Sequence, residues 1–142
     1  MQLKLASFSV LLGILLAACS SKPALVGTWS CASATIDGKS LPQSTASRLR
    51  LTLTKDRYKT EKDSEVLFDS TYSLDAAKTP NQINMLGTEG DLKGKEAQGI
   101  YLLHDDVLQI CYAMPGQPRP ASFASLPGSG VYLIEWKRQP AK

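Results

Sequence analysis

Histidine is almost absent from the sequence: the 142 residues contain one, His104, together with three cysteines. These residue types most often bind transition metals or supply nucleophiles, so few sites of either kind are available. His104 stands next to Asp105 and Asp106, and three consecutive side chains on an extended backbone splay apart instead of converging on one ion. We therefore expect a polar turn at these residues and no metal site.

The motifs of catalytic and phosphate-binding loops are also missing. No G-x-S-x-G nucleophile elbow occurs, although a Ser-His-Asp arrangement assembled only in space stays open at this stage. The segment Asp37–Ser40 looks like the end of a phosphate-binding loop, but Ser33 stands where the first glycine of that loop should be. We therefore expect that the protein is not an enzyme and uses no cofactor.

The sequence has little net charge and only one long apolar run. Its 16 Lys and Arg against 13 Asp and Glu give a formal net charge of +3, which is too weak to indicate binding to nucleic acid. The apolar run is Leu5–Ala18, and it follows a short segment, Met1–Lys4, with one positive charge. Because a helix needs about 20 apolar residues to cross a bilayer, we predict a signal peptide over residues 1–18.

The apolar run ends in the sequence LAAC, Leu16–Cys19, which resembles the lipobox of bacterial lipoproteins. The resemblance implies cleavage before Cys19, lipidation of its thiol and, with Ser20 following, an anchor in the outer membrane. Several acyl chains, at ~0.8 kcal/mol per buried CH₂, make such an anchor effectively permanent. We expect a lipidated tether over residues 19–24 and one domain over residues 25–142. A secreted protein with a chance cysteine is the alternative.

The other two cysteines, Cys31 and Cys111, form a pair in an exported protein, whose compartment is oxidising. A disulfide between them would close a long loop and add ~4 kcal/mol of stability in the chain-entropy model. Two buried free thiols on different strands are the other interpretation, because the sequence does not give the Cα separation that a disulfide requires.

After residue 24 no segment shows helical periodicity, and short alternating runs are separated by turn residues. Leu49, Leu51 and Leu53, for example, fall on one face of a single run. Sequential hairpins favour an all-β, up-and-down β-barrel of eight to nine antiparallel strands without helix, because closing the sheet removes exposed edges. An immunoglobulin-like sandwich is the alternative. The predicted strands are Val26–Ile36, Ser47–Thr54, Arg57–Glu61, Glu65–Leu74, Gln82–Leu86, Ile100–Leu103, Val107–Ala113 and Val131–Arg138.

Short motifs at both ends of the domain resemble the lipocalin superfamily. GTW at residues 27–29 looks like the G-x-W signature, and EWKR at residues 135–138 puts a base at the end of the last strand. In lipocalins such a base packs over the tryptophan at the closed end of the barrel. Strand parity makes Arg138 the candidate partner of Trp29, and a cation over an indole contributes ~0.5–2 kcal/mol.

Seven pieces of the chain resemble, in the same order, an uncharacterised family of short bacterial lipocalin-like domains. The resemblance implies the barrel fold, and it brings no catalytic residue because the family has no established activity. The pieces are LVGTW (25–29), DGK (37–39), YSLDAAKTP (72–80), GIYLL (99–103), LQICYA (108–113), RPASF (119–123) and WKR (136–138).

A barrel of eight strands is wide enough either to be filled by its own side chains or to hold one small ligand, and the sequence leaves both open. We expect Val66, Ile100 and Leu102 to face inward, and the Gly-rich segment Gly87–Gly99 to be a mobile loop with frayed strand ends. The candidate ligand-lining residues are Phe68, Ser70, Tyr72, Met85, Tyr112 and Trp136.

The function expected from these features is that of an outer-membrane-anchored lipoprotein whose lipocalin-like barrel binds a small hydrophobic molecule. The alternative is an interaction or inhibitor module with a filled barrel. For that alternative, the Pro-rich loop Met114–Phe123 is the candidate surface for an envelope protein partner. Arg119 and Phe123 in it are residue types favoured at binding hot spots. A loop that only stiffens the fold explains the same residues.

Overall fold

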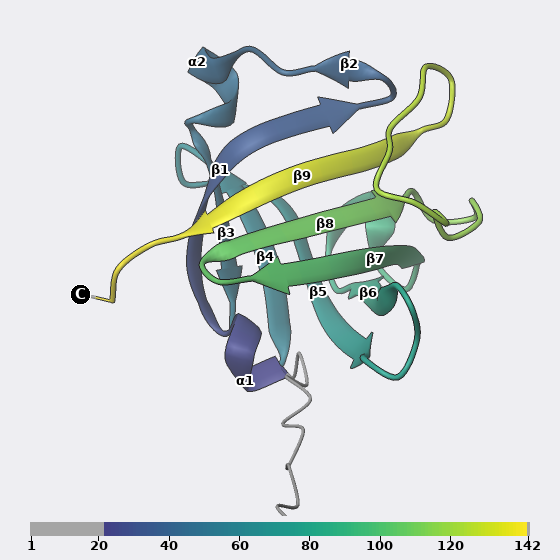
Figure 1. Cartoon of the computed structure of the whole chain (residues 1–142), viewed down its shortest axis with the longest axis horizontal. Helices are drawn as coiled ribbons and strands as arrows, with labels where there is room; N and C mark the ends of the chain where they lie inside the picture. The colour runs from purple at the N-terminus through teal and green to yellow at the C-terminus, as the bar shows by residue number, and fades with distance from the viewer. Residues whose placement is uncertain (1–21, 142) are drawn as a thin grey trace, which may run out of the picture.

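The computed structural model describes residues 22–141, which form a closed antiparallel barrel (Figure 1). The sheet order is β2-β1-β3-β4-β5-β6-β7-β8-β9, and an additional pairing of β1 with β9 closes the barrel and leaves the short β2 outside the ring. The predicted all-β, up-and-down barrel is therefore confirmed. The strands are β1 (Gly27–Ile36), β2 (Lys39–Ser40), β3 (Leu49–Leu53), β4 (Arg57–Lys62), β5 (Glu65–Asp75), β6 (Asn81–Gly87), β7 (Glu96–His104), β8 (Val107–Ala113) and β9 (Val131–Arg138).

Tight turns set the order of the hairpins. Asp37 and Gly38 between β1 and β2 both have positive φ, 50° and 76°, and so do Asp63 and Ser64 between β4 and β5, at 49° and 71°. Two consecutive residues of this kind match the type I′ turn, whose twist fits that of antiparallel strands. From β3 to β9 each strand pairs with the next strand in sequence, whereas β2 pairs only with β1.

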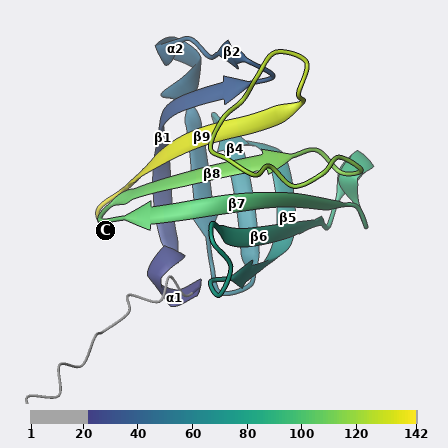
Figure 2. The same cartoon turned by 45° about the vertical axis from the view of Figure 1, so that its right-hand side comes forward.

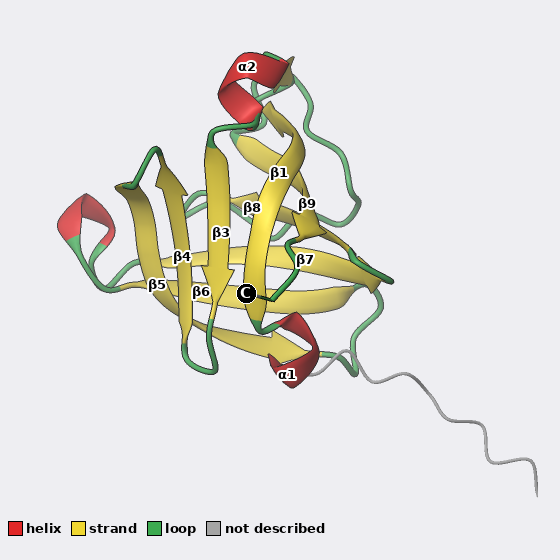
Figure 3. Ribbon diagram, turned by 90° about the vertical axis from the view of Figure 1, so that its left-hand side faces the viewer, coloured by secondary structure: helices red, strands yellow, loops and turns green. Residues whose placement is uncertain are grey.

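Three short helical segments lie outside the barrel wall, so the prediction of a chain without helix was wrong. They are α1 (Lys22–Leu25), α2 (Gln43–Ala46) and the 3-10 turn η1 (Gly90–Leu92). Each is a single turn, too short to show the apolar periodicity by which a helix is predicted. The two α-helical turns lie at opposite ends of β1 (Figure 3), and α1 includes residues that were expected to belong to the tether.

The inner core and an outer apolar cluster lie on the two faces of β7 and β8. Tyr101 pairs with Ile110 and both belong to the barrel core, so Ile100 on β7 faces outward. Ile100 is nevertheless buried, and Leu102 is 47% exposed, so the prediction that both face inward was wrong. Apolar residues on both faces of β7 hide the alternation on which that prediction rested.

The prediction for Val66 was wrong for a different reason. A β-bulge shifts the register between β4 and β5, so that Thr60 pairs with Phe68 but Glu61 pairs with Val66. The extra residue turns the first residues of β5 outward, and Val66 is 49% exposed.

The connection between β8 and β9, residues 114–130, crosses the outer face of the barrel (Figure 2). The Cys111 thiol on β8 donates to the carbonyl of Ser122 in this connection, over 3.5 Å. Ser125 ties the connection to β9 and to the turn between β1 and β2. Its hydroxyl donates to the Val131 carbonyl at 2.7 Å and accepts from the Gly38 amide at 3.0 Å. The connection covers Cys111, and Ile100, which pairs with Cys111 on the neighbouring strand, is buried on the same outer face.

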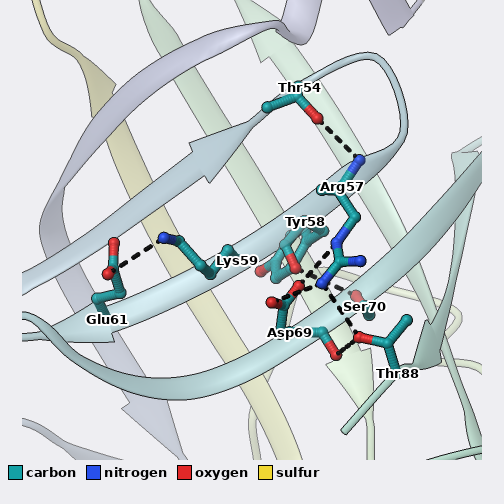
Figure 4. A network of polar contacts seen from close by, with 8 residues as sticks. All are labelled: Thr54, Arg57, Tyr58, Lys59, Glu61, Asp69, Ser70 and Thr88. Atoms are coloured by element: carbon teal, nitrogen blue, oxygen red, sulfur yellow. Dashed lines mark hydrogen bonds and ion pairs between the residues drawn. The ribbon is translucent and has the colours of Figure 1, made fainter.

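The connection between β6 and β7 is shorter than expected and is tied to the barrel by a polar network (Figure 4). Arg57 Nε donates to Asp69 Oδ1 at 3.0 Å and Arg57 Nη2 lies 2.7 Å from Asp69 Oδ2. Thr88 donates through both its amide and its hydroxyl to the Asp69 carbonyl, each over 3.0 Å. Because β7 begins at Glu96, the last part of the segment predicted as a mobile loop is strand.

Candidate functional site

One end of the barrel is closed by α1. Leu25 of α1 is fully buried, and the Trp29 indole Nε1 donates to the Leu25 carbonyl at 3.1 Å. The Arg138 guanidinium lies 4.2 Å from the centroid of the Trp29 ring. Arg138 also donates to the carbonyls of Ala24, at 2.7 Å, and Val26, at 3.1 Å. The structure thus brings together the two residues that the lipocalin resemblance paired.

The closure reaches across to β5. Lys22 Nζ of α1 lies 4.4 Å above the ring of Tyr72, and the Tyr72 hydroxyl donates to the Thr54 carbonyl at 2.8 Å. Ser70 donates to the Tyr58 carbonyl at 3.3 Å, and Met85 is fully buried. Tyr72 and Met85 belong to the core cluster, and Ser70 is buried beside Tyr58; none of the three is among the residues that line the cavity described next.

The other end of the barrel holds an apolar cavity of about 370 Å³. Pockets for small molecules have volumes of about 300–1,000 Å³ and are mostly apolar, so the cavity falls in this range. Three of the predicted ligand-lining residues, Phe68, Tyr112 and Trp136, belong to its wall. The lining residues are Ile36, Leu41, Thr45, Leu49, Thr60, Lys62, Leu67, Phe68, Leu92, Ala97, Tyr112, Met114, Pro115, Tyr132, Ile134 and Trp136.

The cavity runs along β9 from its mouth to the middle of the barrel. Tyr132 pairs with Ile36 at the end of β1, whereas Trp136 pairs with Cys31, closer to the closed end. Trp136 is four positions after Tyr132 in β9, a depth of roughly 13 Å at about 3.3 Å per residue. The rings of Tyr112 and Tyr132 are stacked along one wall, with centroids 5.0 Å apart and planes inclined by 14°. Trp136 therefore lies at the deep end.

Gly99 on β7 makes room for Tyr112 in this wall. A Cβ at Gly99 would lie 2.7 Å from both the Cys111 carbonyl oxygen and the Tyr112 Cβ. Such distances are shorter than van der Waals contact, so a side chain here would displace the strand that carries Tyr112.

Two polar groups are buried without a partner among the described residues: Trp136 Nε1, in a residue of the cavity wall, and the Tyr58 hydroxyl, in a residue that is not part of the wall. Tyr58 packs edge-on against the cavity residue Phe68, with ring centroids 6.1 Å apart. Burial raises the pKa of Tyr58 above its ordinary value, and burial together with Tyr58 and Tyr132 raises the pKa of Tyr112. Both phenols are therefore uncharged at neutral pH.

The remaining polar groups of the cavity wall are few. Thr45, Thr60 and Lys62 line it, and Lys62 is the one charged side chain in the wall as far as the chain is described. No Asp, Glu or His lies among these lining residues. The wall offers hydrogen bonds but, in the described part of the chain, no carboxylate or imidazole to act as a general base.

Cys31 and Cys111 are buried free thiols, the second of the two interpretations that the sequence left open. They lie on opposite sides of β9, since Cys31 pairs with Trp136 and Cys111 with Leu133. Cys31 belongs to the barrel core, whereas Cys111 contacts the outer connection. Burial, and then Glu135, raise the pKa of Cys31 to about 11, and burial raises the pKa of Cys111.

Arg119 of the outer connection is bound to the barrel. Its Nη1 donates to the carbonyls of Ile83, at 3.0 Å, and Gly99, at 2.7 Å, and its Nη2 donates to Asn84 Oδ1 at 2.6 Å. Phe123 is partly buried in the same connection. These contacts give Arg119 a role in holding the connection on β6 and β7, which is the architectural explanation of the loop.

The other residues singled out in the sequence lie outside the cavity wall. His104 Nε2 lies 3.4 Å from Asp105 Oδ2 in the exposed turn between β7 and β8. No cluster of three or more metal-binding side chains occurs within residues 22–141. In that same range no helix is long and apolar enough to cross a membrane. Residues 1–21, with the predicted signal peptide and Cys19, lie outside the described residues.

The sequence did not identify most of the cavity wall. Leu41 comes from the segment before α2, Thr45 from α2 and Leu92 from η1. The two helical turns are too short to show a recognisable sequence pattern. Ala97 lies in the segment expected to be a loop. The alternation of β9, which puts Tyr132, Ile134 and Trp136 on one face, was the available signal.

Comparisons of the chain with models of protein families, with curated proteins and with solved structures found no match.

Proposed function

We propose that this protein is an outer-membrane lipoprotein, anchored through lipid on Cys19, whose barrel binds one small apolar molecule. The observation that carries the binding part is the cavity of about 370 Å³ between Trp136 and the mouth, lined mostly by apolar side chains. Removing an apolar molecule from water is favourable by about 25 cal/mol per Å² of buried surface. The cavity is open at one end, so a ligand can enter without rearrangement of the barrel.

A binding role fits the chemistry of the wall better than a catalytic role. A catalytic site needs a nucleophile or a proton-transferring group within hydrogen-bond reach of the substrate. The described cavity wall offers threonine and tyrosine hydroxyls, Lys62 and an indole, and the pKa of Tyr112 is raised, away from the value that proton transfer at neutral pH requires. The lipocalin resemblance of the GTW motif points in the same direction.

The position of the cavity has a consequence for the anchored protein. The described chain begins at Lys22 in α1, at the closed end, whereas α2 lies at the end that holds the cavity (Figure 1). Lys22 is three positions after Cys19 in the sequence, a reach of at most roughly 10 Å at about 3.3 Å per residue. We therefore expect the closed end to face the membrane and the mouth to face away from it, so that the ligand is taken from the aqueous side.

Native mass spectrometry of the purified protein tests the binding proposal. We expect an additional mass of one small molecule that is released on denaturation, or the uptake of one molecule of the uncharged probe N-phenyl-1-naphthylamine. A protein that carries no additional mass and takes up no probe contradicts ligand binding and favours the interaction module.

Labelling with radioactive palmitate tests the anchor separately. We expect label in the wild-type protein and none in Cys19→Ser, because the serine hydroxyl does not replace the thiol in lipidation. Absence of label from the wild type contradicts the proposed location in the outer membrane and leaves the binding proposal unaffected.

A further inference from the structure

A lysine faces the inside of the barrel at its open end. Tyr58 and Thr60 of β4 are buried, and Lys62, the last residue of this strand, follows them on the same face. Leu49 pairs with Lys62 on β3, and both residues line the cavity. Lys62 is half-buried, and a lysine in such a place packs its aliphatic part against the wall and keeps its ammonium group in water.

The ammonium group of Lys62 has no ion-pair partner within residues 22–141. Lys59 on the outer face of the same strand differs in this respect, because its Nζ lies 3.2 Å from Glu61 Oε1 (Figure 4). Glu65 stands opposite Lys62 across the hairpin of β4 and β5, but no ion pair joins the two side chains. Lys62 is therefore free to bind a charge from outside the chain.

The deep part of the cavity has no place for a charge. Ala97, Ile134 and Trp136 belong to its wall, and Lys62 is the one charged residue of the wall in the described part of the chain. An ion at the deep end would be buried without a partner, at a large cost in free energy. A charged group on a ligand must therefore stay at the mouth.

A neighbouring groove carries the opposite charge. It shares Leu67, Phe68 and Leu92 with the cavity, and its acidic residues are Asp69, Glu89 and Asp91. Asp69 is already ion-paired with Arg57, and the other two are exposed, where water and salt screen their charges. None of the three belongs to the cavity wall, so we expect Lys62 to determine which charge the mouth prefers.

We propose that the ligand is an elongated apolar molecule with one anionic group at its end, and that Lys62 binds this group at the mouth of the cavity. The inference rests on the proposed binding function and specifies its ligand. The apolar part extends along β9 toward Trp136, and the anionic group stays in contact with water. Because an ammonium group is a point charge without a fixed binding geometry, Lys62 selects the sign of the charge and not one particular anionic group.

Three probes with the same alkyl chain separate the ligand classes. Decanoate is an anion, decylammonium is a cation, and decan-1-ol reports binding of the chain without a charge. We expect decanoate to bind about 3- to 10-fold more tightly than decylammonium, because attraction of the anion and repulsion of the cation by one half-exposed lysine each contribute a few-fold. Equilibrium dialysis of the purified protein at neutral pH, with each probe below the concentration at which it aggregates, measures the three affinities.

Substitutions of Lys62 test whether this residue is the source of the preference. The ratio of the decanoate affinity to the decylammonium affinity is compared within each variant, so a change in packing that affects both probes cancels. In Lys62→Met the two affinities should become equal within about 2-fold, Lys62→Glu should reverse the preference, and Lys62→Arg should retain it. Lys59→Met is the matched control: it changes the net charge by the same amount outside the wall and should keep the wild-type ratio.

Brominated probes locate the two ends of the ligand. Bromine quenches tryptophan fluorescence at short range, and the two tryptophans of the chain are Trp136 at the deep end and Trp29 at the closed end. We expect ω-bromodecanoate to quench the emission more strongly than α-bromodecanoate, whose bromine lies beside the carboxylate at the mouth. Equal or stronger quenching by α-bromodecanoate overturns the placement of the anionic group.

The outcomes separate the inference from the proposed function. Equal affinities for decanoate and decylammonium in the wild type, a preference for the cation, or a ratio that is the same in Lys62→Met as in the wild type overturns the inference. Loss of the preference in Lys59→Met does so too, because the net charge and not Lys62 would then set it. Binding of decan-1-ol in any of these cases leaves the proposed function standing. Failure of all three probes to bind overturns both proposals.

Discussion

At the closed end of the barrel the Trp29 indole donates to the Leu25 carbonyl and lies under the Arg138 guanidinium, 4.2 Å from its ring centroid. At the other end the Trp136 indole lines a cavity of about 370 Å³ and has no acceptor in the described chain. Both rings are buried and both come from strands that pair with each other. The difference is therefore in what surrounds each ring: α1 and a cation beside Trp29, and the deep end of the cavity beside Trp136.

The two ends of this small domain therefore serve different needs: the closed end contributes stability, and the other end keeps a cavity. A filled, hydrogen-bonded end provides stability. Its side chains make van der Waals contacts on all sides, and its buried polar groups have hydrogen-bond partners. A cavity gives up some of that stability, since the atoms of its wall lack contact partners on one side. The comparison predicts that the same substitution has unequal effects at the two ends.

The largest expected effect follows from truncating the ring at the closed end. Trp29→Ala removes a fully buried indole, its bond to Leu25 and the surface on which Arg138 packs. We expect a loss of about 3–5 kcal/mol in the free energy of unfolding, as for other large aromatic residues in cores. Urea denaturation followed by circular dichroism measures it. A loss of less than about 1 kcal/mol would show that the closed end is not the stabilising part.

Replacing each tryptophan by phenylalanine compares the two ends with one change. Trp29→Phe leaves the Leu25 carbonyl without its donor and should cost roughly 1–3 kcal/mol. Trp136→Phe removes a buried N–H that has no partner, which stabilises the folded state. This gain offsets the packing lost with the smaller ring, so the net loss in the free energy of unfolding should stay within about 1 kcal/mol. Equal costs in urea denaturation would contradict the comparison.

A smaller effect is expected from the cation at the closed end. Arg138→Ala should cost about 0.5–2 kcal/mol, the range of a cation over an aromatic ring, and should be non-additive with Trp29→Ala in a double-mutant cycle. Arg48→Ala is the matched control, because Arg48 forms an exposed ion pair with Asp63 and its removal should leave stability close to that of the wild type. Strict additivity of Arg138→Ala and Trp29→Ala would mean that Arg138 does not stabilise the fold through its contact with Trp29.

The smallest effect concerns alkaline pH. Burial raises the pKa of Cys31 to about 11 and raises the pKa values of Tyr58 and Tyr112, so the folded protein keeps these protons where the unfolded chain loses them. Because the unfolded state then binds fewer protons, stability falls as the pH rises, by less than about 1 kcal/mol between about pH 7.5 and about pH 9. Thermal unfolding at the two pH values measures the change, and Cys31→Val should reduce it. A melting temperature that rises with pH would contradict these buried protonation states.

The barrel was predictable because alternation and turns are local signals. Leu49, Leu51 and Leu53 mark one face of β3, and the observed strand of Val107–Ala113 agrees with the predicted one. Residue faces were less predictable where a second layer covers the barrel. Ile100 is buried on the outer face of β7, and a single sequence does not separate an outer cluster from an inner one.

The candidate site was predictable only in part for a related reason. Phe68, Tyr112 and Trp136 followed from strand parity, whereas Tyr72 and Met85 have the same parity but are not among the residues that line the cavity. Parity gives the face of a strand and not the depth at which space remains. That depth depends on how all eight strands and the single-turn helices fill the interior, which no local pattern contains.

A titration with the uncharged fluorescent probe N-phenyl-1-naphthylamine tests the central claim most directly. Ala97 is buried and lines the cavity, so Ala97→Leu fills space there, whereas Leu102→Ala removes an exposed apolar side chain on the outer face of the same strand. The account predicts one probe per wild-type chain, affinity reduced roughly tenfold or more in Ala97→Leu, and unchanged affinity in Leu102→Ala. Wild-type binding in Ala97→Leu, or binding lost in Leu102→Ala, would place the probe on the outside of the barrel and contradict a ligand site in the open half.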